Sequence, residues 1–197
     1  AEFGEVIRFP GRELTPGQLI DTDVLLVRSI TRVDAELLSQ AKKLKFVGTA
    51  TIGEDHIDKQ LLVQKGIAFS SAPGCNAVSV AEFVLSAVLV LAEKYNFQLT
   101  DKTFGIVGIG NIGKCLQGKL KALGVKLLLC DPVRAEQEYD DPIDSPFIDL
   151  ELLLQQADII SFHTPLEKNG LFSSYHLLNA DNIKLLKPEV CLINASR

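Results

Sequence analysis

The segment of residues 102–114 constrains the fold of this chain more than any other part of the sequence. A short apolar run ending at Val107 passes directly into three glycines with the spacing G-x-G-x-x-G, namely Gly108, Gly110 and Gly113. This pattern predicts a strand, a tight turn and a helix whose first N–H groups face a pyrophosphate. We expect Gly108 to bend the chain, Gly110 to let a phosphate approach closely, and Gly113 to let the helix pack against the strand.

An acidic residue follows at the position where the ribose of a dinucleotide would lie. A helical stretch at 112–123 and an apolar strand at 126–130 lead to Asp131, 18 residues after the last of the three glycines. A carboxylate there accepts hydrogen bonds from both ribose hydroxyls and repels the 2′-phosphate of NADP, so NAD is the predicted cofactor. One alternative is that the glycines form only a tight connection and that Asp131 starts a turn before Pro132. Arg134 could also pair with a 2′-phosphate, but the carboxylate in front of it argues against this.

Composition and charge narrow the class of protein. The 197 residues are 47% hydrophobic, which is enough for one large or two modest domains with real cores. The net charge is −5 and the basic residues are scattered, so no nucleic-acid partner is expected. The longest apolar stretch, 83–92, is too short to span a bilayer, and no charged leader precedes it. We expect a soluble, cytoplasmic protein with no membrane contact.

The cysteines and histidines suggest no metal site. Cys75, Cys115, Cys130 and Cys191 lie far apart without a C-x-x-C pair, and we expect them to be reduced core thiols. The three histidines lack the clustered spacing of metal ligands, so no metal is expected. The chain has no methionine and begins at Ala1, which suggests a piece of a longer protein.

Short apolar runs alternate with amphipathic runs along the chain, which is typical of parallel strands joined by crossover helices. The predicted fold class is therefore α/β. The predicted strands are 5–9, 23–28, 45–49, 67–70, 104–107, 126–130, 158–163 and 190–194. The predicted helices are 15–20, 34–41, 56–65, 77–94, 112–123, 150–156 and 181–185. The acidic, proline-bearing segment 136–149 is expected to be a solvated loop.

The helix at 77–94 is apolar around most of its circumference and is expected to be buried. Asn76 follows a Pro-Gly break and is placed to cap it. Gly66 lies just past the last residue of the preceding helix and is placed as its C-terminal cap. His56 would begin that helix, and we expect it to be a surface or capping residue. We assign no role to His176.

Four strings together resemble the D-isomer-specific 2-hydroxyacid dehydrogenases. They are GIVGIGNIG at 105–113, SVAE at 79–82, FHTPL at 162–166 and LINASR at 192–197. The resemblance covers essentially the whole chain and implies two partial, doubly wound parallel domains. Residues 1–76 would be the N-terminal part of a flavodoxin-like substrate domain, 77–95 a connecting helix, and 96–197 an incomplete Rossmann NAD-binding domain.

The first-domain strings look most like the branch of this family that oxidises 4-phospho-D-erythronate. They are VRS at 27–29, FVGTATIG at 46–53, DHID at 55–58 and SAPGCNA at 71–77. The resemblance implies oxidation of the 2-hydroxyl to a 2-oxo acid, with hydride passing to NAD, on the route to pyridoxal 5′-phosphate. The alternatives are a family member acting on 3-phosphoglycerate, glycerate or lactate, a non-catalytic NAD-sensing corepressor, and an NAD-binding regulatory module that has lost its C-terminal half.

The resemblance also implies roles for single residues. Arg197 would be the catalytic arginine that grips the substrate carboxylate, because a guanidinium meets a carboxylate with two parallel charge-assisted bonds. Ser29 and Thr51 would contact substrate, although either could be an ordinary strand-end hydroxyl, and Arg197 could be merely a charged residue at a chain end. The implied cofactor contacts are Gly108, Gly110, Asn111, Ile112, Gly113, Asp131, Thr164, Ala195, Ser196 and Arg197. His163 would border the cofactor pocket.

The family's catalytic histidine and its orienting glutamate lie well downstream of the arginine, and neither is in this chain. The resemblance therefore predicts that these 197 residues alone are inactive and marginally stable, and that the complete protein is a homodimer with a small-molecule substrate. Arg28 and Arg32 are candidates for binding the substrate phosphate, but neither is assigned that role.

Overall fold

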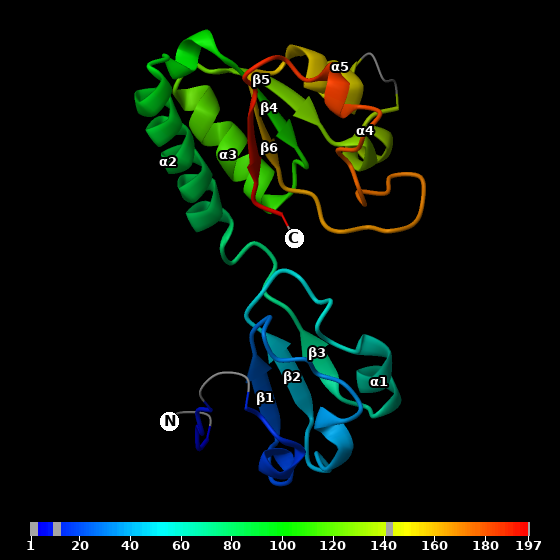
Figure 1. Cartoon of the computed structure of the whole chain (residues 1–197). Coiled ribbons are helices and arrows are strands. Elements are labelled where there is room, and N and C mark those ends of the chain that lie inside the picture. Colours follow the sequence, from blue (N-terminus) through cyan, green and yellow to red (C-terminus); the bar gives the residue numbers. More distant parts are fainter. Residues whose placement is uncertain (1–3, 10–12, 141–143, 197) are drawn as a thin grey trace. The chain divides into compact units, whose positions relative to one another are not determined.

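The computed structural model describes residues 4–9, 13–140 and 144–196 (Figure 1). The chain divides into two compact units, Ala1–Cys75 and Asn76–Arg197. Each unit holds one parallel sheet, which confirms the predicted α/β class. Within the described ranges, no helix is long and apolar enough to cross a membrane.

The first unit is a three-stranded parallel sheet in the order β1-β2-β3. Its strands are β1 (Val24–Val27), β2 (Phe46–Thr49) and β3 (Ala68–Ser70), and its helical segments are η1 (Pro16–Leu19), η2 (Leu37–Ser39) and α1 (Lys59–Gln64). Leu25, Val27 and Val47 from the sheet pack with Leu38 and Leu62 from the helical segments to form its core. The three strands match the predicted ones to within one residue at each end.

Two helix predictions in this unit were too long, and one strand prediction was wrong. The helices predicted at 15–20 and 34–41 are only short 3-10 segments of four and three residues. Residues 5–9 form no strand, and Val6 and Ile7 are 70% and 67% exposed. A strand is stable only when its N–H and C=O groups are paired, and an apolar run alone does not supply a partner.

Helix α1 begins at Lys59 rather than at His56. Asp58 is its N-cap, and the Asp58 carboxylate accepts the N–H of Leu61 at 2.9 Å. Gly66 follows the helix with a φ of +68°, which confirms its predicted role as a C-terminal cap. His56 lies before the cap and is 8% exposed, so the expectation of a surface or capping residue was wrong.

The second unit is a four-stranded parallel sheet in the order β5-β4-β6-β7. Its strands are β4 (Thr103–Val107), β5 (Lys126–Cys130), β6 (Ile159–Phe162) and β7 (Cys191–Asn194). Its helices are α2 (Ala77–Tyr95), α3 (Asn111–Ala122), α4 (Pro132–Glu138) and α5 (Leu150–Gln156), with 3-10 segments η3 (Leu99–Asp101) and η5 (Ile183–Leu185). The helix predicted at 181–185 is therefore only a single 3-10 turn.

Helices cover both faces of this sheet (Figure 1). Alternate residues of β4 point to opposite faces, so Phe104 and Ile106 pack with α2 and α3, while Val107 packs with Leu153 and Leu154 of α5. At Gly105 an added Cβ would lie 2.6 Å from Leu153 Cδ2, so the absence of a side chain lets α5 approach the strand. The glycine-rich turn is thus held between two packed layers.

The prediction that the helix at 77–94 is buried was wrong for one of its faces. One face of α2 packs on α3 through Ala81, Val84 and Val88, which repeat at helical spacing. The other face carries exposed apolar side chains, among them Phe83 at 68%. Asn76 occupies the N-cap position, but its side chain makes no capping hydrogen bond.

Helix α4 was not predicted: residues 132–135 were given no structure, and residues 136–138 fall in the segment expected to be a loop. Asp131 is its N-cap, Pro132 takes the first helical position, and the helix runs to Glu138. Both residue types are favoured at these positions, because the aspartate accepts a free N–H and proline has none to leave unpaired. Residues 141–143 of the same predicted loop lie outside the described residues.

The cysteines occupy different surroundings, and all four are free thiols. Cys130 is buried at the end of β5, and burial raises the pKa of its thiol to about 12. Cys75 is exposed, so the expectation that all four are core thiols was wrong for this residue. In the part of the chain that the structure describes, no three His, Cys, Asp or Glu residues cluster as metal ligands would.

Candidate functional site

The carboxyl ends of the four strands of the second unit lie side by side. Register pairs Val107 with both Cys130 and Phe162, and Phe162 with Asn194. Hydrogen bonds continue one residue further: the N–H of Gly108 donates to Cys130 O at 2.9 Å, and the N–H of the residue after Phe162 donates to Val107 O at 2.8 Å. The residues that follow the four strands therefore line one edge of the sheet.

The chain reverses its direction of winding at β4. From β4 it passes through α3 to β5 on one side, and it then returns through α5 to β6 on the other. Open α/β sheets bind ligands in the crevice at such a switch point, outside the carboxyl ends of the strands. The glycine-rich turn after β4 and the segment after β6 stand at this crevice.

Each glycine of the turn meets a different constraint in the structure. Gly108 has a φ of +90°, and an added Cβ there would lie 2.9 Å from the backbone of His163 and Thr164. At Gly113 an added Cβ would lie 2.1 Å from Gly108 O, so only glycine lets α3 pack against the turn. At Gly110 an added Cβ would meet no atom within 4 Å. The space in front of Gly110 is thus open, as close approach of a pyrophosphate requires.

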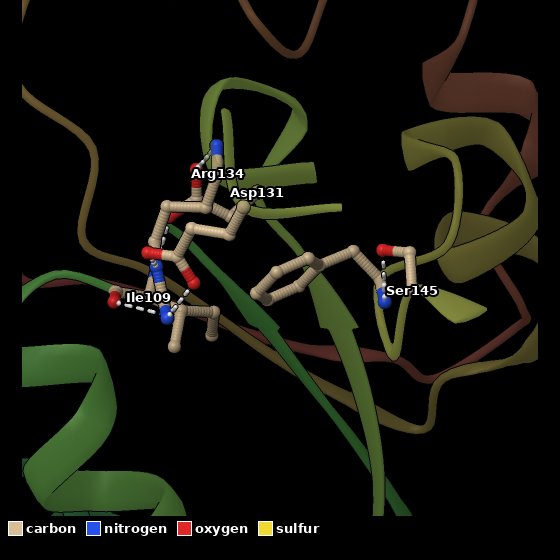
Figure 2. A network of polar contacts seen from close by, with 6 residues as sticks. Ile109, Asp131, Arg134 and Ser145 are labelled. Carbon is tan, nitrogen blue, oxygen red and sulfur yellow. Dashed lines mark hydrogen bonds and ion pairs between the residues drawn. The ribbon is translucent and has the colours of Figure 1, made fainter. Parts of the chain in front are cut away.

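Asp131 clamps the glycine turn from the end of β5 (Figure 2). Its Oδ2 accepts the N–H of Ile109 at 2.7 Å, and its Oδ1 accepts the N–H of Arg134 in the first turn of α4 at 3.1 Å. A carboxylate has about four acceptor positions, so two remain for other donors. Asp131 does begin a helix, in line with the alternative interpretation that it only starts a turn. Its two remaining acceptor positions are still enough for two ribose hydroxyls.

Arg134 is committed to partners within the chain. Its Nη1 donates to Ile109 O at 3.0 Å, while Nε and Nη2 donate to the Glu138 carboxylate at 2.8 and 2.6 Å. The guanidinium also lies over the ring of Phe147, 5.2 Å from its centroid. These bonds lower the pKa of the Glu138 carboxyl and raise that of Arg134. The cation that could have met a 2′-phosphate is already neutralised by Glu138.

The other predicted cofactor residues gather at the same edge. Asn111 and Ile112 open α3 directly behind Gly110, and Thr164 follows β6. After β7, Ala195 donates its N–H to Phe162 O at 3.2 Å. Ser196 donates from its N–H and its hydroxyl to the side-chain oxygen of Asn194 at 2.9 and 2.6 Å. Arg197 lies outside the described residues.

His163 is held as a neutral ring beside the glycine turn. Its Nε2 lies 2.9 Å from the hydroxyl of Ser161, and its Nδ1 is buried without a partner among the described residues. Burial lowers the pKa of His163 to about 4 from an ordinary 6.5. Near neutral pH the ring therefore adds no positive charge at this edge of the sheet.

The lowered pKa of His163 predicts a pH-dependent stability. The unfolded chain binds this proton near pH 6.5 and the folded protein only near pH 4, so the free energy of unfolding should fall by up to about 3 kcal/mol as the pH drops through that window. The variant His163→Gln keeps a hydrogen-bond partner for Ser161 but has no titrating ring. Its free energy of unfolding should therefore depend less on pH in this window. Urea unfolding of both proteins from pH 7 to pH 4 tests this. Equal slopes would contradict it.

In the first unit, the predicted substrate residues also come to one edge of the sheet. Val27 of β1 and Thr49 of β2 are in register, and Ser29 and Thr51 each follow two residues later. Ser29 is exposed and Thr51 is half-buried. No hydrogen bond between their side chains is found in the described structure. They are related only by their position after the carboxyl ends of two neighbouring parallel strands.

Several contacts of these two sheets were not predicted from the sequence. Glu138, which holds Arg134, could have been found from its spacing of four residues on a helix. Ile109 contacts Asp131 and Arg134 only through its backbone N–H and C=O groups. The type of side chain at this position does not indicate such a role. Thr49 and His56 are seven residues apart in the sequence, and their side chains form a buried hydrogen bond. No short sequence motif predicts this contact.

Comparison with known proteins identifies the family. Residues 89–197 match the model of the NAD-binding domain of D-isomer-specific 2-hydroxyacid dehydrogenases. This chain belongs to that family. The predicted family and its NAD-binding domain are thereby confirmed, and the glycine turn, Asp131 and the ends of β6 and β7 all lie within the matched range.

Individual relatives show which members of the family this chain resembles. The chain is 57% identical over 196 residues to erythronate-4-phosphate dehydrogenase of Proteus mirabilis and 53% identical over 197 residues to that of Tolumonas auensis. All of this chain is covered in both matches, but only 51% and 52% of the relatives, so the chain spans about half the length of the curated relatives it matches. A crystal structure of NAD⁺-bound 3-phosphoglycerate dehydrogenase from Entamoeba histolytica superposes with a TM-score of 0.76 at 25% identity, covering 96% of this chain and 60% of that one.

Proposed function

We propose that the complete protein is an NAD-dependent dehydrogenase that oxidises 4-phospho-D-erythronate at C2 to its 2-oxo acid. The observation that carries the proposal is the clamp of Asp131 on the glycine turn, which leaves the carboxylate two acceptor positions and leaves the space before Gly110 open. The match to relatives named erythronate-4-phosphate dehydrogenase over the whole chain supports the substrate.

The chain's own residues would bind and orient the two reactants. The N–H groups that open α3 would hold the pyrophosphate, and Asp131 the adenosine ribose. Ser29 and Thr51 would contact substrate, and the guanidinium of Arg197 would grip the substrate carboxylate. The bound NAD supplies a hydride acceptor for the hydrogen on C2, while the proton of the 2-hydroxyl passes to a base, so that a C=O bond forms.

By the family resemblance, the base would be a histidine oriented by a glutamate, and none of the three histidines of this chain is assigned the role. The 197 residues alone should therefore bind parts of both ligands without turnover. We further propose that the first unit is part of the substrate domain, that α2 connects it to the NAD-binding domain, and that the complete protein is a cytoplasmic homodimer on the route to pyridoxal 5′-phosphate.

Turnover of several acids by the complete protein tests the proposal. With NAD and each acid in turn, NADH formation should give a kcat/KM for 4-phospho-D-erythronate at least about tenfold above those for 3-phosphoglycerate, glycerate and lactate, a difference of about 1.4 kcal/mol in transition-state binding. A higher value for another acid would move the protein to that substrate. Binding of NADH without turnover of any of them would favour a non-catalytic NAD sensor.

A further inference from the structure

A buried chain of hydrogen bonds runs behind Thr51 in the first unit. His56 Nε2 lies 3.0 Å from the hydroxyl of Thr49, which lies 2.7 Å from the hydroxyl of Thr51, and the latter donates to Gly53 O at 3.0 Å. Thr49 is 3% exposed and His56 is 8% exposed. The outer end of this chain is the half-buried Thr51, so two buried polar residues support a single hydroxyl at the edge of the sheet.

The donor and the acceptor in each of these hydrogen bonds follow from the last bond of the chain, the one to Gly53 O. A backbone carbonyl can only accept, so the one proton of Thr51 goes to Gly53 O. Thr51 must then accept the proton of Thr49, and Thr49 must accept from the Nε2–H of His56. The ring is therefore the Nε2–H tautomer. This leaves Nδ1 as an acceptor, and Nδ1 has no partner in the described structure.

The backbone around His56 is fixed as well. Its carbonyl oxygen accepts the N–H of Val33 at 2.8 Å, and the N–H of Asp58 donates back to Val33 O at 2.9 Å. Val33 is fully buried in the core of the unit. The backbone that carries the imidazole is thus anchored to the core, and the bond from Nε2 to Thr49 holds the ring itself.

We infer that His56, acting through Thr49, is a positioning residue that holds the hydroxyl of Thr51 as a hydrogen-bond acceptor for the 3-hydroxyl of the substrate. With its proton committed, Thr51 offers a lone pair, which suits a donor and not the anionic oxygens of a phosphate or carboxylate. Of the two hydroxyls of 4-phospho-D-erythronate, the one on C2 loses its proton in the reaction, so the one on C3 remains as the donor. This inference rests on the proposed function.

The test compares two substrates with the complete protein: 4-phospho-D-erythronate and its analogue without the 3-hydroxyl, D-2-hydroxy-4-phosphobutyrate. His56→Leu and Thr49→Val, which replace buried groups by apolar ones of similar size, should each raise KM for the first substrate roughly fivefold with little change in kcat, the effect of one lost hydrogen bond. Neither should change KM for the analogue. His56→Gln should restore the wild-type KM, because its side-chain amide can donate as Nε2–H does.

Equal effects on both substrates, no effect on either, or no rescue by glutamine would overturn the inference. The imidazole ¹⁵N shifts of His56 give a readout that needs no substrate: they should show a protonated Nε2, and a protonated Nδ1 would overturn the bond directions. If the wild-type protein fails to oxidise 4-phospho-D-erythronate at all, the proposed function falls, and the part of the inference that names the 3-hydroxyl falls with it. The ¹⁵N shifts would still decide the tautomer.

Discussion

Replacing Gly110 with alanine is expected to lower the affinity of the complete protein for NADH by about 100-fold or more while leaving its fold intact. No atom of the chain lies within 4 Å of the added Cβ, so nothing inside the protein opposes it. The methyl group would instead stand in front of the first turn of α3, where the N–H groups are proposed to hold the pyrophosphate. Two lost hydrogen bonds to charged oxygens cost about 3 kcal/mol, which gives this factor. Alanine at an N-cap costs the helix no more than about 1 kcal/mol.

Two other glycines of α3 serve as controls. Gly113→Ala places a Cβ 2.1 Å from Gly108 O, so α3 must shift and the protein should lose stability together with NADH binding. Gly118 is exposed, and an added Cβ there meets nothing. Gly118→Ala should keep full affinity and gain about 0.5–1 kcal/mol of helix stability.

Calorimetric titration with NADH and urea unfolding of the three variants separate binding from folding. Wild-type affinity in Gly110→Ala, within a factor of two, would show that the pyrophosphate does not approach this residue. A stable Gly113→Ala variant would show that the packing of α3 on the turn tolerates a methyl group. The first outcome would remove the structural basis for the proposed nucleotide site.

The nucleotide-binding part of the fold could be predicted closely because its signals are local. An apolar run, three glycines at fixed spacing and a second apolar run specify β4, α3 and β5 in order, and the observed elements differ from the predicted ones by at most one residue at each end. The glycines are informative because each meets a separate constraint: a positive φ at Gly108, contact with a carbonyl at Gly113, and open space at Gly110.

The parts that could not be predicted depend on contacts distant in sequence. Residues 5–9 have a strand-like pattern, but the pattern does not show whether a partner strand is present. One face of α2 is apolar and exposed at Phe83 and Val90, and composition alone did not show which face packs. His56 was misplaced because its burial depends on a hydrogen bond to Thr49 and on backbone pairing with Val33.

The preference for NAD over NADP is expected to depend on Asp131 and to weaken sharply when its charge is removed. In the wild-type protein, a 2′-phosphate would meet this carboxylate at a site where Arg134 is already paired with Glu138. Asp131→Asn keeps an oxygen that can cap α4, but it removes the charge and two of the acceptor positions. NADH should bind about 10- to 100-fold more weakly, the effect of losing hydrogen bonds to a charged group, and the preference over NADPH should shrink by a similar factor.

Substitution of Glu138, the partner of Arg134, tests the same preference for NADH over NADPH in a second way. Glu138→Gln frees the guanidinium of Arg134 from its ion pair, but the charge of Asp131 still repels a 2′-phosphate, so this variant alone should change the preference little. In the double variant with Asp131→Asn the free guanidinium meets a neutral neighbour, and NADPH should bind more tightly than in either single variant. Non-additive effects of this kind are expected for residues that share one network.

A matched control lies at the opposite edge of the same sheet. Asp158 also accepts a backbone N–H, that of Thr103 at 2.7 Å, and it pairs with Lys187 at 2.9 Å, contacts that lower the pKa of its carboxyl despite partial burial. Asp158→Asn should therefore reduce stability and leave the ratio of NADH to NADPH affinity unchanged. If Asp131→Asn likewise changed stability alone, its carboxylate would be a structural clamp on the glycine turn, and the ribose would have to be recognised by another residue.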